Sequence, residues 1–124
     1  MYKVNIKESN KELSARERIK IKDTTNAIKL DGVEPDEKLV FSPDYYAILE
    51  IENDKADTKD KKYNQFIVVD KSGTKYVTGS KSFWDSFINI YNEMKDESEP
   101  YEIEVYKMPT KNYTGKYFIT CSIV

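Results

Sequence analysis

The chain has 124 residues, of which 39% are hydrophobic and 34% are charged, and its formal net charge is −2. This length fits a single domain with a hydrophobic core. The near balance of the two signs excludes a histone-like polycation and a strongly acidic disordered chain. No apolar run approaches the roughly 20 residues of a membrane span, and the first ten residues contain no signal-peptide segment.

The sequence contains one cysteine, Cys121, and no histidine. A lone cysteine forms no internal disulfide, which favours a reducing compartment and a cytoplasmic protein. Without histidine, the commonest general base, the usual zinc sites and histidine-assisted nucleophiles are all missing. We therefore expect a protein that is not an enzyme and that holds no cofactor or metal.

Residues 1–14 are polar and weakly patterned, which predicts a flexible arm or a short helix. Ser14 and Glu17 have the spacing of a helix capping box. However, Ile19 and Ile21 alternate with lysines, and this favours a strand over about 17–23, followed by an extended piece at 26–30. Glycine and proline among acids predict a loop at 31–37.

Four strands are expected in the middle of the chain, at about 38–42, 45–52, 65–69 and 75–78. The second of them alternates in the manner of a half-buried strand. Ser72 and Gly73 predict a tight turn between the last two. A charged loop is expected at 53–62.

A helix is expected at about 81–95, with Ser82 as its N-cap. Its apolar residues lie within an arc of about 160°, which is typical of a core-facing surface. Pro100 prevents the helix from continuing. Two alternating segments follow, at 101–107 and 117–124, and Cys121 is expected on the inward face as a small buried hydrophobic residue.

One helix between a third strand region and a last hairpin is the element order of an OB-fold. We therefore expect a mainly β protein, with an OB-fold-like five-stranded barrel over 15–124. An open α+β sheet is the alternative.

Two sequence patterns are candidates for catalysis or metal binding, and both are incomplete. Asp44, Glu50 and Glu52 resemble the start of a metal-dependent nuclease motif, but the expected lysine after the second acid is absent. The acids of the 53–60 segment do not have EF-hand spacing.

The last hairpin carries the most informative pattern. Lysines and aromatic residues are interleaved over thirteen positions without an acid: Tyr106, Lys107, Lys111, Tyr113, Lys116, Tyr117 and Phe118. Single-strand binding requires cations along the phosphates and flat rings for splayed bases. Lys75-Tyr76 and Lys62-Tyr63 form two further candidate groups. However, tyrosine is a good strand former, and ten tyrosines in a β-rich domain need no ligand.

From Arg18 onward, the sequence resembles the small single-stranded-DNA-binding proteins of tailed phages that replicate linear genomes by protein priming. The matching pieces are 18–21, 35–40, 72–76, the following helix and 115–123. Where that family has a lysine before the hairpin glycine, this chain has Thr114. The family's second-strand tyrosines do not fall on Tyr45 or Tyr46 without a gap.

The resemblance implies a barrel fold and sequence-independent binding of displaced single strands during phage DNA replication, in the host cytoplasm. It carries over Tyr76 as a residue near DNA and matches Phe118 to a family aromatic. Single-stranded DNA is the expected partner, with replication proteins as further partners and no membrane. The alternative function is a phage-encoded inhibitor that acts on a host enzyme through an acidic patch at 93–104.

The sequence thus predicts one set of nucleic-acid-binding residues. Tyr76, Tyr106, Tyr113 and Phe118 would stack on bases, and Lys75, Lys107, Lys111 and Lys116 would contact phosphates. Lys62 and Tyr63 complete the set.

Overall fold

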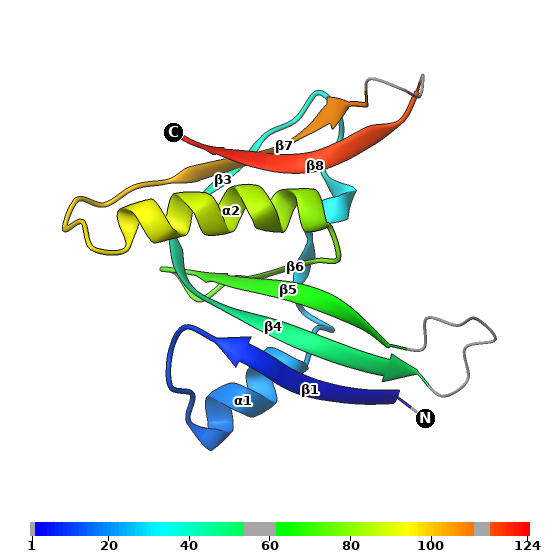
Figure 1. Ribbon diagram of the computed structural model, residues 1–124, viewed down its shortest axis with the longest axis vertical. Coiled ribbons are helices and arrows are strands. Elements are labelled where there is room, and N and C mark those ends of the chain that lie inside the picture. Colours follow the sequence, from blue (N-terminus) through cyan, green and yellow to red (C-terminus); the bar gives the residue numbers. More distant parts are fainter. Residues whose placement is uncertain (1, 54–61, 111–114) are drawn as a thin grey trace. The chain divides into compact units, whose positions relative to one another are not determined.

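The computed structural model describes residues 2–53, 62–110 and 115–124 (Figure 1). The chain folds as two compact units. The first unit comprises Met1–Ile28 and Asp44–Gly79, and the second comprises Lys29–Pro43 and Ser80–Val124. Residues 15–124, which were expected to form one domain, therefore contribute to both units.

The first unit is built on an antiparallel sheet. Its strands are β1 (Tyr2–Ser9), β4 (Pro43–Asn53), β5 (Lys62–Asp70) and β6 (Lys75–Thr78). They lie in the order β1-β4-β5-β6, with the two-residue β2 (Ile28–Lys29) after β6. Residues 2–9 thus form an edge strand, and the prediction of a flexible arm or short helix is wrong there.

A core cluster of the first unit lies on one sheet face. Alternate residues of β4 are buried, namely Ala47, Leu49 and Ile51, as their period of two predicts. Ile67, Val69 and Val77 extend this cluster over β5 and β6. Ile21 of α1 (Ala15–Lys22) joins it, so α1 packs on this face.

The helix α1 replaces the strand that was expected over 17–23. The Glu17 amide donates to Ser14 Oγ at 3.2 Å, and the Ser14 amide donates to Glu17 Oε1 at 3.1 Å. This reciprocal cap satisfies two amides that have no partner within the helix. Ile21 is 1% exposed whereas Ile19 is 72% exposed. Only one of the two isoleucines is therefore buried, and their alternation with lysines does not mark a strand.

The second unit combines a three-stranded antiparallel sheet with the helix α2 (Lys81–Met94) and a short 3-10 turn, η1 (Leu30–Gly32). The strands lie in the order β3-β7-β8, where β3 is Leu39–Phe41, β7 is Ile103–Pro109 and β8 is Tyr117–Ile123. The predictions of α2, β7 and β8 are confirmed to within about two residues at each end.

The N-terminus of α2 differs in one detail from its prediction. Ser80 is the N-cap, since its Oγ accepts a hydrogen bond from the Phe83 amide at 3.1 Å. Ser82 instead donates its hydroxyl to the Ile119 carbonyl at 2.8 Å and so ties α2 to β8. Phe83, Trp84 and Phe87 are the buried part of the predicted apolar stripe.

One face of the β7–β8 hairpin is buried. Val105 pairs with Cys121 and Ile103 with Ile123, and Ile103, Val105 and Cys121 are at most 5% exposed. Burial raises the pKa of the Cys121 thiol to about 12. Cys121 is therefore a small buried side chain, as predicted, and is not activated for nucleophilic chemistry.

The mainly β class is confirmed. Over residues 2–53, 62–110 and 115–124, the strands form two open sheets and no closed barrel, and a second helix, α1, accompanies α2. Neither of these described helices is long and apolar enough to cross a bilayer.

Candidate nucleic-acid interface

The second unit presents a largely unburied sheet face at the β7–β8 hairpin. Tyr106 pairs with Thr120, and Met108 pairs with Phe118. Because directly opposed residues of an antiparallel pair point to the same side, these four side chains share one face. We call Tyr106, Met108 and Phe118 the hairpin platform.

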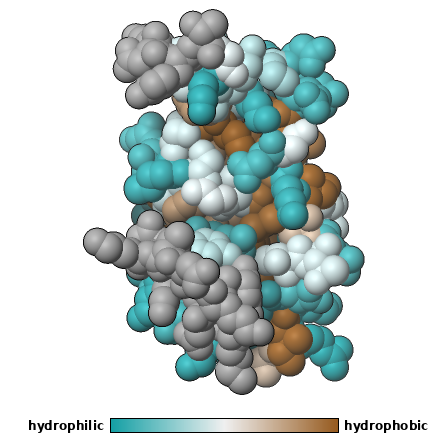
Figure 2. Space-filling view, turned by 90° about the vertical axis from the view of Figure 1, so that its right-hand side faces the viewer, coloured by the Kyte–Doolittle hydropathy of each residue, from teal (hydrophilic) through white to brown (hydrophobic). Residues whose placement is uncertain are grey.

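The hairpin platform exposes apolar atoms to solvent. Met108 is 43% exposed and Phe118 is 39% exposed, and Tyr106 is half-buried. Figure 2 shows that hydrophobic side chains reach the surface between hydrophilic ones on the side that it presents. Among the residues that the structure describes, the large exposed hydrophobic residues of the second unit are Val40, Met108, Tyr117, Phe118, Ile123 and Val124.

Two contacts fix the Tyr106 ring. Its hydroxyl and Ser122 Oγ form a hydrogen bond of 2.6 Å. The Lys38 ammonium lies 5.7 Å from the ring centroid, within the range of a cation–π contact. Lys38, which the sequence did not single out, precedes β3 and enters the site because Leu39 pairs with Val105.

The predicted lysines of this region lie around the hairpin. Lys107 pairs with Ile119, on the opposite face from Tyr106, and it lines two grooves, one with Phe118 and one with Tyr106. Lys116 is exposed beside the hairpin turn, where its carbonyl accepts from the Thr110 amide at 2.9 Å. Gly115 there has φ +80°, which a residue with a Cβ rarely adopts. Lys111 and Tyr113 lie outside the described residues.

Tyr76 does not match its predicted role. The side chain is only 5% exposed, and its hydroxyl donates to Asp70 Oδ2 at 3.0 Å. Burial and the Asp70 hydrogen bond raise the pKa of Tyr76 to about 12. A base has no ring face to stack on here, so the assignment of Tyr76 as a stacking residue is wrong.

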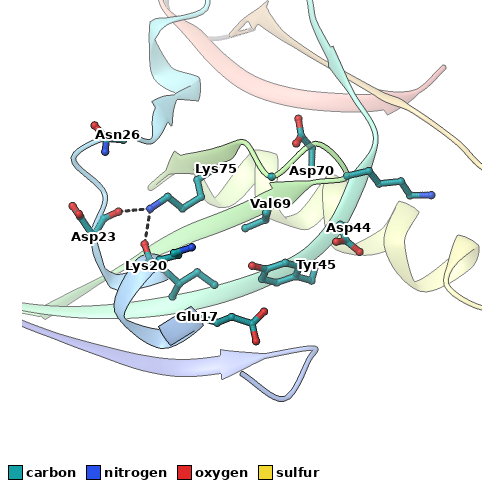
Figure 3. Close-up of a pocket in the computed structure, with 12 residues that line it drawn as sticks. Glu17, Lys20, Asp23, Asn26, Asp44, Tyr45, Val69, Asp70 and Lys75 are labelled. Carbon is teal, nitrogen blue, oxygen red and sulfur yellow. Dashed lines mark hydrogen bonds between the residues drawn. The ribbon is translucent and has the colours of Figure 1, made fainter. Parts of the chain in front are cut away.

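Lys75 holds α1 against β6 (Figure 3). Its ammonium donates to the Lys20 carbonyl at 2.5 Å and to the Asp23 carbonyl at 2.6 Å. These carbonyls end the helix without partners inside it, and a cation there also opposes the negative end of the helix dipole. Its hydrogen bonds thus give Lys75 a structural role in place of the predicted phosphate contact.

We expect Lys75→Met to lower the free energy of unfolding by about 1 kcal/mol, since two charge-assisted hydrogen bonds are lost at a partly exposed site. Urea denaturation followed by circular dichroism measures the change. Lys71→Met is the matched control, because Lys71 lines the same hollow and is exposed. Equal stability of the two variants would contradict the capping role.

The remaining predicted pair lies in the first unit. Lys62 and Tyr63 begin β5, where Lys62 is exposed and Tyr63 is 40% exposed. The structure thus brings Tyr106, Lys107, Lys116 and Phe118 together at one hairpin, whereas Lys62 and Tyr63 belong to the other unit.

The hollow in Figure 3 has a volume of about 510 Å³ and is lined by both apolar and charged side chains. Asp44, from the nuclease pattern, is one of the lining residues, together with lysines and other carboxylates. In the part of the chain that the structure describes, no three acidic or cysteine side chains are placed to hold a metal ion.

Comparison with known proteins gave no matching family model, no similar curated protein and no similar solved structure. A function for this chain is therefore inferred from the geometry of the hairpin platform.

Proposed function

We propose that this protein binds single-stranded DNA without catalysis and without sequence preference. Bases would stack on Phe118 and on the neighbouring platform residues. Lys116 would contact phosphates, and so would Lys107, which starts on the other face of the sheet but lines one groove together with Phe118. The observation that carries the proposal is the exposed aromatic and apolar face of the β7–β8 hairpin, formed by Met108 and Phe118 beside Tyr106.

The hairpin platform suits single-stranded DNA, because the bases of a single strand can unstack from one another and stack on an aromatic side chain. Stacking on an aromatic side chain stabilises binding by about 1–3 kcal/mol per base and tolerates any base. Phe118 and Met108 already expose apolar surface to water, so covering them with a base removes that surface from solvent.

Local charge supports the same function. Although the whole chain carries a net charge of −2, residues 105–124 contain three lysines and no acid. The potential near a surface is governed by nearby charges, and this segment provides the cations that a phosphate backbone needs.

The biological setting of the proposal comes from the resemblance to phage proteins. The protein would coat and protect displaced strands during phage DNA replication, in the cytoplasm of the host cell. A closed OB-fold barrel belongs to that fuller hypothesis, but the hairpin platform does not depend on it, because its three residues come from one hairpin.

Fluorescence anisotropy of a labelled thymidine oligonucleotide tests the proposal, with the matching duplex and an RNA oligonucleotide measured beside it. We expect saturable binding to the single strand, weaker binding to the duplex, and an affinity that falls as salt rises. Absence of binding to the single strand at low salt would reject the proposed function.

An acidic segment favours a second candidate function, that of an inhibitor of a host enzyme. Between the last turn of α2 and β7, the side chains of Glu93, Asp96, Glu97, Glu99 and Glu102 are all exposed. A surface of this kind attracts a basic protein partner. Binding to a host nuclease or polymerase, with no affinity for oligonucleotides, would select this function.

A further inference from the structure

We infer that Lys38 is a phosphate-binding residue of the hairpin platform and that Glu104 holds it back in the free protein. The inference rests on the proposed function and deepens it. It assigns a role to two residues that the sequence pattern does not connect, since they are 66 positions apart.

The geometry places Lys38 between two partners. Its ammonium is 3.5 Å from Glu104 Oε1 and 5.7 Å from the Tyr106 ring centroid. Glu104 and Tyr106 are two positions apart on β7 and therefore share the face that carries the platform. Val40 of β3 pairs with Glu104, which brings the start of β3 next to this face. Lys38 thus places an ammonium over the ring of Tyr106, one of the three platform residues.

The pair with Glu104 is one that a phosphate can displace. The Lys38 side chain is 62% exposed, and its distance to Glu104 is at the long end for a hydrogen bond. Exposed ion pairs of this kind contribute little stability. A phosphate that approaches while its base stacks on the platform would therefore compete with Glu104 for Lys38.

The acids of the same groove explain why Glu104 should weaken binding. A groove of about 380 Å³ is lined by Asp36, Glu37, Lys38, Glu104 and Lys107, among others. Its carboxylates outnumber its lysines, so a phosphate can enter favourably only where a lysine faces it. Removing the charge of Glu104 both releases Lys38 and lowers this repulsion.

We expect Lys38→Gln to weaken binding of the thymidine oligonucleotide about fivefold and to flatten the salt slope by about 0.7, the value for one phosphate contact on a single strand. Lys38→Arg should keep most of the affinity, because it keeps the charge. Glu104→Gln should strengthen binding about threefold at low salt.

A double-mutant cycle separates a restraint on Lys38 from direct repulsion by Glu104. If Glu104 acts mainly by holding Lys38, then Glu104→Gln should change affinity by less than about twofold in the Lys38→Gln background. An equal gain in both backgrounds would overturn the inferred restraint.

A second ion pair of the same unit supplies matched controls. Lys81 and Asp85 on α2 are 2.6 Å apart and exposed, and they lie outside the groove and the platform. Lys81→Gln and Asp85→Asn change net charge as the test variants do, and we expect them to leave affinity within about twofold. If the wild-type protein does not bind the oligonucleotide, the proposed function is rejected. If the wild-type protein binds it and the Lys38 and Glu104 variants bind with the same affinity, only the role of these two residues is rejected.

Discussion

Replacing Asp70 by alanine is expected to lower the free energy of unfolding by about 3 kcal/mol, because hydrogen bonds to one buried carboxylate are lost together. Asp70 Oδ1 accepts from the Ser72 amide at 3.0 Å, the Ser72 hydroxyl at 2.7 Å and the Thr74 amide at 2.8 Å. Oδ2 accepts from the Tyr76 hydroxyl. Asp70 is 7% exposed and Tyr76 is 5% exposed, so loss of the carboxylate leaves the Tyr76 hydroxyl with little water to replace it.

The effect should depend on pH. Burial acts to raise the pKa of Asp70, but hydrogen bonds from Ser72, Thr74 and Tyr76 together outweigh it, and the pKa lies below its ordinary value. A carboxyl whose pKa falls on folding stabilises the folded state fully above its unfolded pKa of about 3.9. That contribution is lost as pH falls through the folded pKa.

Urea denaturation of wild type and Asp70→Ala at neutral pH and below about pH 4 measures both effects. The difference in stability should narrow in acid. Asp85→Ala is the control, since Asp85 is exposed and pairs with Lys81 one helix turn away. Hydrogen exchange should place the loss in the β5–β6 amides, and a loss no larger than that of Asp85→Ala would contradict the role of Asp70.

The elements with strong apolar periodicity were predictable from the sequence. The stripe of α2 and the alternation of β7 and β8 correspond to side chains that are buried, such as Phe87, Val105 and Cys121. In these segments the local pattern and the tertiary burial agree, so the period alone identifies the element.

The N-terminal elements were mispredicted because their patterns are short. In β1, Val4 and Ile6 are half-buried between exposed polar residues, and so short an alternation does not distinguish an edge strand from an arm. In α1, the alternation of Ile19 and Ile21 competed with the capping box of Ser14 and Glu17. The capping box was the stronger signal, because it satisfies backbone donors at the helix start.

The candidate site was predictable in part. Alternation places Tyr106 and Phe118 on one face of a hairpin, but it cannot distinguish a platform tyrosine from Tyr76, which is buried. Asp70, two residues before Ser72 and Gly73, could have predicted that a carboxylate accepts hydrogen bonds from the backbone of this turn. Lys38 could not be placed from the sequence, because it meets Glu104 only through the pairing of β3 with β7.

Phe118→Ala is expected to raise the Kd for single-stranded DNA about tenfold or more, because one base loses the aromatic side chain on which it stacks. The salt dependence should stay the same, since no cation is removed. Anisotropy titrations at several salt concentrations measure both quantities. Phe118→Tyr should keep the affinity, whereas Phe118→Leu, which retains apolar surface without an aromatic face, should lose most of it.

Tyr117 provides the matched control for that prediction. It is the adjacent residue of β8 and is 49% exposed, but it pairs with Pro109 and so faces the other side of the sheet. If bases stack on the hairpin platform, Tyr117→Ala should change the Kd far less than Phe118→Ala does. A larger effect at Tyr117 would move the binding face to the opposite side of the hairpin, and equal effects would show that the hairpin binds through exposed aromatic area without a preferred face.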